Sequence, residues 1–144
     1  MPIVMFSKKC ELGLQAVLLL SIKNKAKIFN ATEISNELKV PKEFVSKVLQ
    51  TLTDSGIVGS KKGKNGGFYL AKNPKEIRLN EIVEAIDGFE VFQQCVLGFP
   101  GCSNNKPCPV HNTWGKIRDE AFKMLSEETL EDFKIKTQNK ISSL

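Results

Sequence analysis

The alternation of hydrophobic and polar positions predicts a mainly helical chain. Residues 11–22 are apolar nearly all round over a helical length, which is typical of a helix buried on most of its faces. Asn30 and, three residues later, Glu33 resemble an N-terminal capping box, so we expect a short second helix over residues 31–38.

A third helix is predicted between a proline and a glycine. Pro41 suits the first position of a helix, and Gly56 suits a left-handed C-terminal cap. The apolar residues between them share one helical face: Phe44, Val45, Val48, Leu49 and Leu52. The opposite face of this helix is therefore expected to meet solvent or a ligand.

After this helix the spacing of hydrophobic residues changes from helical to strand-like. Residues 57–58 and 68–70 form short strand-like runs around a lysine- and glycine-rich segment. Asn65-Gly66 at its tip predicts a β-hairpin, because both residues of such a turn must tolerate positive φ.

Helical periods return in the second half of the chain. One helix is indicated by Leu79, Ile82, Val83 and Ile86, closed by Gly88. A longer helix has an apolar seam formed by Val110, Trp114, Ile117, Ala121 and Met124. This seam is long enough to pair with a partner helix. Thr129 with Asp132 predicts the cap of a last, weakly amphipathic helix.

Together these elements predict a mainly α fold with a small β-hairpin. A helix, a turn, a second helix and a Lys/Gly-rich hairpin, in this order, indicate a winged helix-turn-helix. We expect a winged helix-turn-helix DNA-binding domain over residues 1–88 and a cysteine-rich loop over residues 89–109. A dimerisation helix and a C-terminal helix are expected over residues 110–144.

The composition agrees with a globular fold, and the charge distribution shows that the two halves of the chain differ. With 144 residues, 41% hydrophobic and 26% charged, the chain is neither disordered, nor fibrous, nor a small disulfide scaffold. Its net charge of +5 combines two unlike halves. Residues 1–75 carry +8 and residues 76–144 carry −3, so the first half suits a polyanion.

The N-terminal segment lacks a secretory signal, and the longest apolar stretch, residues 12–22, is too short to cross a membrane. We therefore expect a cytoplasmic protein that does not bind membranes. Thiols stay reduced in that compartment, so the four cysteines are expected to be ligands, reactive groups or core residues.

The candidate DNA-binding residues lie on the third helix and in the hairpin. The outer face of the helix presents Lys42, Glu43, Ser46 and Lys47, and the hairpin presents Lys61, Lys62, Lys64, Asn65 and Gly66. Recognition helices place such a face in the major groove, while lysines beside glycines approach phosphates or the minor groove. Each half alone is also compatible with a solvated lysine surface, but their ordered combination favours DNA.

The second constellation is Cys95-x6-Cys102-x5-Cys108-x2-His111. Thiolates and imidazoles bind zinc and iron–sulfur centres, and the wide cysteine spacings favour a cluster over a zinc knuckle. His111 is the single histidine, and a lone histidine is often a surface or core residue. Cys10 is expected in the core, and Glu11 as a first-turn carboxylate favoured by the helix dipole.

On these residues the chain resembles the IscR/NsrR-type family of winged-helix iron–sulfur cluster transcription regulators. The resemblance covers roughly residues 6–133, and its specific parts are the wing over residues 62–70 and the three-cysteine loop. It implies a homodimer on a pseudo-palindromic double-stranded operator, most often as a repressor. For base reading it implies Glu43, Ser46 and Lys47, with Lys62 in the minor groove.

The resemblance also implies the cluster ligands. Cys95, Cys102 and Cys108 match the three cysteine ligands of the family. His111 matches the fourth ligand of IscR-like members, whereas Glu11 lies where some NsrR-like members use a carboxylate from the partner subunit. A histidine-ligated [2Fe–2S] cluster is favoured, and a carboxylate-ligated [4Fe–4S] cluster is second.

The expected function is transcriptional regulation that responds to redox state, nitric oxide or iron–sulfur status. One alternative is a winged-helix regulator with a zinc or empty thiol site that senses cysteine oxidation or a small molecule. A second is an iron–sulfur electron-transfer protein. No nucleophile–base pair is visible, so we do not expect an enzyme.

Overall fold

The computed structural model describes residues 6–22, 28–90, 95–101 and 103–144. In this part of the chain six α-helices, one 3-10 helix and a two-stranded sheet follow one another. They are α1 (Lys8–Ile22), α2 (Ala31–Leu38), α3 (Lys42–Asp54), β1 (Val58–Lys61), β2 (Gly67–Leu70), η1 (Pro74–Glu76), α4 (Leu79–Ile86), α5 (His111–Glu127) and α6 (Lys134–Ser142). The predicted fold class, a mainly α winged helix-turn-helix with one hairpin, is confirmed.

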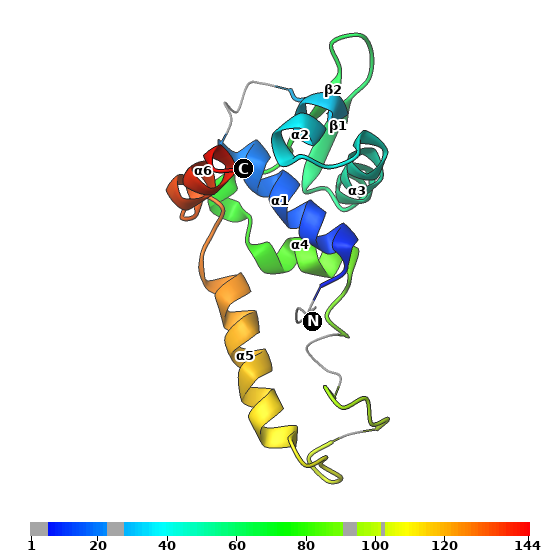
Figure 1. Ribbon diagram of the computed structural model, residues 1–144, viewed down its shortest axis with the longest axis vertical. Coiled ribbons are helices and arrows are strands. Elements are labelled where there is room, and N and C mark those ends of the chain that lie inside the picture. The colour runs from blue at the N-terminus through cyan, green and yellow to red at the C-terminus, as the bar shows by residue number, and fades with distance from the viewer. Residues whose placement is uncertain (1–5, 23–27, 91–94, 102) are drawn as a thin grey trace.

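Helix α1 forms the centre of the molecule, and α3, α4 and α6 pack around it (Figure 1). The hairpin lies at one end of the body, and α5 extends away at the other end (Figure 1). Val17 and Leu19 of α1, Ile34 of α2 and Leu49 of α3 are buried in one continuous core. The apolar residues whose spacing predicted the helices are thus the residues through which the helices pack.

Helix α1 begins earlier than predicted, at Lys8, because Ser7 caps it. The Ser7 hydroxyl accepts a hydrogen bond from the Cys10 N–H at 3.0 Å. Ser7 is itself held by Asp87 after α4: its N–H donates to Oδ2 at 2.8 Å and its hydroxyl to Oδ1 at 2.5 Å. These bonds attach the start of α1 to the end of α4.

Helices α2 and α3 follow the predicted helix-turn-helix. The Asn30 side chain accepts from the Glu33 N–H at 2.8 Å, which confirms the predicted cap of α2. Pro41 is the extended N-cap of α3, with φ −62° and ψ 137°, rather than its first helical residue. Gly56 adopts the predicted left-handed conformation, with φ +84°.

The hairpin is confirmed, but its predicted Asn-Gly turn is wrong. Antiparallel pairing places Ser60 opposite Phe68. Positive φ falls at Gly63 (+108°) and Gly67 (+156°), not at Asn65 and Gly66. The connection is longer than a two-residue turn, so the residues that need positive φ shift to its two sides.

A short bridge joins the hairpin to the segment before α2. The Phe29 N–H donates to the Phe68 carbonyl at 3.0 Å, and the Phe68 N–H donates back at 2.7 Å. A Cβ at Gly67 would lie 2.5 Å from the Phe29 carbonyl oxygen. Glycine is therefore required at position 67 both by its φ and by this close approach.

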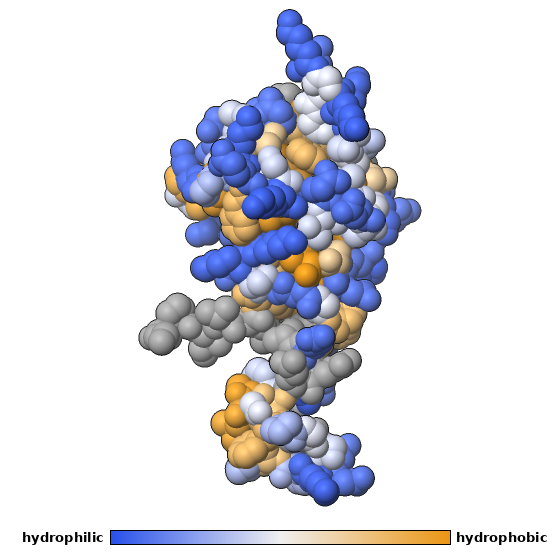
Figure 2. Space-filling view, turned by 90° about the vertical axis from the view of Figure 1, so that its right-hand side faces the viewer, coloured by the Kyte–Doolittle hydropathy of each residue, from blue (hydrophilic) through white to orange (hydrophobic). Residues whose placement is uncertain are grey.

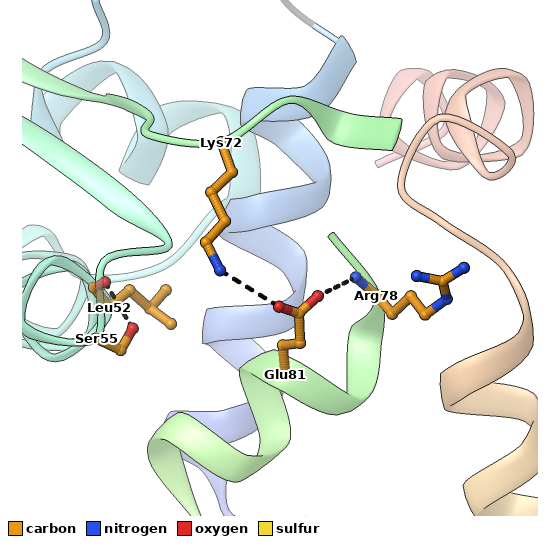
Figure 3. A network of polar contacts seen from close by, with 5 residues as sticks. All are labelled: Leu52, Ser55, Lys72, Arg78 and Glu81. Atoms are coloured by element: carbon orange, nitrogen blue, oxygen red, sulfur yellow. Dashed lines mark hydrogen bonds and ion pairs between the residues drawn. The ribbon is translucent and has the colours of Figure 1, made fainter. Parts of the chain in front are cut away.

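Glu81 fastens the start of α4 to the segment that follows the hairpin (Figure 3). Its carboxylate accepts from the Arg78 N–H at 2.7 Å and lies 3.5 Å from the Lys72 ammonium. Figure 3 also shows the end of α3, where the Ser55 hydroxyl donates to the Leu52 carbonyl at 2.8 Å. The contacts of Glu81 fix the start of α4, and the cysteine loop follows this helix.

Helices α5 and α6 lie against different partners. The Thr129 N–H donates to the Asp132 carboxylate at 2.9 Å, and this turn precedes α6, which begins at Lys134. Helix α6 then packs on α1, and Leu130 is buried in the main core. Helix α5 packs on α4, and its Leu125 is buried in a small cluster with Cys10 of α1 and Val83 of α4. The division into functional regions stays a prediction.

One residue of the helix-turn-helix is held in an unfavourable backbone conformation. Lys39, between α2 and α3, has φ 59° and ψ 45°, a left-handed conformation that costs a non-glycine residue about 1 kcal/mol. We expect Lys39→Gly to raise the free energy of unfolding in urea by about 0.5–1 kcal/mol. Lys39→Ala is the control, since it keeps the strain and removes only an exposed charge. A Gly variant no more stable than the Ala variant would contradict this assignment.

Candidate nucleic-acid interface and cysteine loop

The two faces of α3 divide as the sequence predicts. Val45 and Val48 are buried against the body of the domain. The predicted contact residues Lys42, Glu43 and Lys47 are exposed, and Ser46 is half-exposed. A polar helical face is thereby presented to solvent on a helix whose other face is fixed by the core, as insertion into a groove requires.

The hairpin carries the predicted basic residues on its exposed part. Lys61, Lys62, Lys64 and Asn65 are exposed, and Gly66 is half-buried. The hairpin projects beyond the body on the side of α3 (Figure 1), and Figure 2 shows hydrophilic side chains gathered at that end of the molecule.

The charge of this surface is not neutralised by ion pairs within the described residues. Those pairs join Lys8 to Glu11, Lys72 to Glu81 and Lys123 to Glu127, and they leave out the hairpin lysines. Exposed ammonium groups beside a polar helical face attract phosphates and release counterions when they bind them. The arrangement therefore fits a nucleic-acid backbone.

The cysteine loop brings together two of the three predicted ligands. The Cys95 and Cys108 sulfur atoms lie 3.2 Å apart, and both residues are half-buried. Cys102 lies outside the described residues. Cys95 follows α4 and Cys108 precedes α5. The contact between their sulfur atoms therefore brings the two ends of the loop together.

His111 is the first residue of α5 and is tied to the loop. Its N–H donates to the Cys108 carbonyl at 3.1 Å, and its ring Nε2 lies 2.9 Å from Asn104 Oδ1. Because an amide oxygen only accepts, this contact fits the imidazole tautomer that carries its proton on Nε2. Ligation of a metal by His111 would then use Nδ1.

Glu11 forms an ion pair on its own helix. It occupies the first turn of α1, where its carboxylate pairs with the Lys8 ammonium at 3.3 Å. The described residues contain no group of three or more His, Cys, Asp or Glu side chains arranged to hold a metal ion.

Cys10 differs from the loop cysteines, as predicted. Its side chain is 0% exposed, which confirms the expectation of a core residue. Burial, and then the charge of Asp87, raise the pKa of the Cys10 thiol to about 12. Since thiolates are the reactive form, Cys10 is chemically inert in the folded protein.

An exposed apolar surface surrounds the cysteine loop and was not predicted from the sequence. Val96, Leu97 and Phe99 are each more than half exposed, at 54%, 53% and 57%. Hydrophobic surface is visible at the lower end of the molecule in Figure 2, where this loop meets α5 in Figure 1. The signal for it is the group of large apolar residues, Val96, Leu97 and Phe99, within a loop rich in proline, glycine and asparagine.

Helix α5 continues this apolar surface. Ile117 and Met124 are 50% and 59% exposed. Phe122 packs its ring edge-on against Phe89 at 5.6 Å, which links α5 to the segment that enters the loop. None of the described helices combines the length and the apolarity that crossing a membrane requires.

Known proteins share both the sequence pattern and the fold. The model of the Rrf2 family, described as an iron-dependent transcriptional regulator, matches residues 6–134. A putative HTH-type transcriptional regulator of Aquifex aeolicus is 30% identical over 131 residues, covering 90% of each chain. The HTH-type transcriptional regulator NsrR of Oceanobacillus iheyensis is 28% identical over 138 residues, covering 95% of this chain and 93% of its own.

Solved structures of low sequence identity have the same fold. CymR, the global cysteine regulator of B. subtilis, matches with a TM-score of 0.74 at 22% identity, over 93% of this chain and 97% of its own. IscR of T. potens matches with a TM-score of 0.71 at 20% identity, over 88% and 83% of the two chains. These likenesses concern the fold alone.

Proposed function

The chain belongs to the Rrf2 family of helix-turn-helix transcriptional regulators, and from this premise we propose that it is a homodimeric repressor controlled by an iron–sulfur cluster. The family relationship implies DNA binding. The proposal adds the signal: redox state, nitric oxide or iron–sulfur status, sensed at the cysteine loop.

The observation that carries the proposal is the approach of Cys95 and Cys108 from the two ends of the loop. Two thiolates on one tetrahedral metal, each about 2.3 Å from it, lie about 3.8 Å apart. The observed separation of 3.2 Å would have to open only slightly to admit iron. The donor set therefore fits a thiolate-bound metal centre.

Cys95, Cys102 and Cys108 would hold the cluster, which supplies electron-transfer and ligand-exchange chemistry when bound. His111 is the first choice as fourth ligand. Metal-binding histidines are oriented by a hydrogen bond to the other ring nitrogen, and Asn104 lies at hydrogen-bond distance from Nε2. Glu11 of the partner subunit is the second choice and goes with a four-iron cluster.

The exposed apolar residues of α5 support a homodimer. Ile117 and Met124 lie seven residues apart, on one face of a helix that extends from its own domain, and a second α5 would cover them. Two winged domains related by a two-fold axis would then present two α3 helices to a pseudo-palindromic operator.

The same elements offer a route from the loop to the DNA. The loop begins after α4 and ends at α5, and the Phe89–Phe122 contact joins its two sides. Occupation or loss of the cluster would change the loop, and with it the position of α5 at the dimer axis. The spacing of the two wings would follow, which is a coupling between two sites.

Anaerobic purification with iron, sulfide and zinc analysis tests this proposal. We expect a coloured protein with about two irons and two sulfides per chain. About four of each would favour the second cluster type and its carboxylate ligand. Colourless protein containing zinc or no metal, from the same preparation, would contradict the cluster assignment and favour a thiol or zinc site.

A further inference from the structure

We propose that Cys95 and Cys108 form a reversible disulfide within one chain when the loop holds no cluster. The disulfide would act as an oxidative lock that prevents cluster loading until it is reduced. The block on cluster loading rests on the proposed function, whereas formation of the disulfide itself does not.

The distance between the two sulfur atoms is the first argument. At 3.2 Å they are in contact but not bonded, since a disulfide has a bond length of about 2.05 Å. They need to approach by only about 1.2 Å. Such proximity favours pairing within the chain over pairing between chains.

The construction of the loop is the second argument. Cys108 is fixed to the start of α5 by the hydrogen bond from the His111 N–H. Cys95 begins a turn in which its carbonyl accepts from the Gly98 N–H at 3.0 Å. Gly98 and Gly101 have φ of +81° and +68°, so glycines make the bends between the two cysteines. A small movement of this glycine-containing segment would bring the two sulfur atoms to bonding distance.

Accessibility is the third argument, and Cys10 provides the contrast. Cys95 and Cys108 are half-buried, so a small reagent reaches them, whereas Cys10 is fully buried with a pKa raised to about 12. The same chain thus contains a reactive pair and an unreactive cysteine that serves as an internal reference.

The oxidant is a low-molecular-weight disulfide such as oxidised glutathione. A thiolate of the pair attacks one sulfur of the reagent, which releases one reagent thiol and leaves a mixed disulfide. The second thiolate attacks that mixed disulfide, forms the Cys95–Cys108 bond and releases the other reagent thiol. The protein loses two protons and two electrons, and the reagent disulfide is reduced to two thiols.

The proposal is tested on iron-free full-length protein, reduced, freed of reductant and exposed to oxidised glutathione. Residual thiols are alkylated and the protein is digested with chymotrypsin, because the tryptic peptide would contain all three loop cysteines. Cleavage after Leu97 separates Cys95 from the other two. We expect mass spectrometry to find Cys95 joined to Cys108, with Cys10 and Cys102 as alkylated free thiols.

Cysteine variants identify the pair. Cys102→Ser leaves a single possible partner for Cys95 in the loop, and its linked peptides should form as fast as in the unaltered protein. Cys95→Ser and Cys108→Ser should instead accumulate the mixed disulfide with glutathione. A product dominated by Cys102 linkages, by linkages between chains, or by mixed disulfides in the unaltered protein would overturn the proposal.

Cluster loading separates the disulfide from the proposed function. Oxidised protein given ferrous iron and then desalted should retain no iron, whereas protein treated first with dithiothreitol should retain it, and Cys10→Ala should behave in the same way. If the disulfide forms but reduced protein takes up no iron, the proposed function fails and the dithiol pair stands. If a cluster assembles but no Cys95–Cys108 linkage forms, the disulfide proposal fails alone.

Discussion

Replacing Lys61, Lys62 and Lys64 together with alanine is expected to weaken binding to a specific duplex about a hundredfold at about 0.15 M salt. The three ammonium groups are exposed on the hairpin and belong to none of the ion pairs between described residues. Each neutralised phosphate releases about 0.9 counterion, so the slope of log affinity against log salt should fall by about three units.

Fluorescence anisotropy over a series of salt concentrations measures both quantities, on a duplex selected by the protein from a random pool. Lys134, Lys136 and Lys140 provide the matched control, because their replacement removes the same charge from α6, which packs on α1. We expect this control to change affinity by less than about threefold. Equal losses in the two triple variants would show that total charge, and not the hairpin, determines binding.

Replacing Cys102 or Cys108 with alanine is expected to abolish the visible absorbance of the purified protein while leaving a folded dimer. The core of the winged domain consists of other residues, among them Leu49, Leu52 and Ile82, so it does not depend on the loop. Cys10→Ala is the matched control, since it removes a cysteine that is fully buried and should leave the spectrum unchanged.

The same spectra identify the fourth ligand. His111→Ala should shift or remove the absorbance, and Glu11→Ala should leave it unchanged. The opposite pattern would transfer the role to Glu11 of the partner subunit. Circular dichroism monitors the fold and sedimentation monitors the dimer. An unfolded Cys102 or Cys108 variant would show that the loop is required for folding, which would contradict a purely sensory role.

The sequence predicts the helix-turn-helix well because its signals are local. Asn30 caps α2 by accepting a hydrogen bond from the Glu33 N–H, three residues along the chain. The buried residues of α3 recur at helical spacing. Gly56 ends α3 where its conformational freedom indicates. Each of these features is determined by neighbours in the chain.

The features that the sequence does not reveal depend on distant contacts. The Ser7–Asp87 bonds and the Phe29–Phe68 bridge join residues far apart in the chain, and no local pattern marks them. The Asn-Gly turn was wrong for a related reason: the bridge at Gly67 and the length of the connection determine where positive φ occurs.

The candidate site shows the same division. Residue types and spacing make the loop cysteines and His111 candidate ligands. They do not reveal that Cys95 and Cys108 lie in contact or that Asn104 meets the imidazole. Both contacts depend on how the loop folds back on itself between α4 and α5.

The packing of α6 on α1 has a consequence for how the protein is made. Helix α1 is synthesised first, yet Leu130 and Ile141, which complete its surroundings, emerge from the ribosome almost a whole chain length later. Chains are translated at about 5–20 residues per second, so the apolar faces of α1 wait for several seconds without their final cover. The winged domain therefore completes its folding only after Ile141 has emerged from the ribosome. A chain truncated before Leu130 would leave the core incomplete and be degraded rather than act as a shorter regulator.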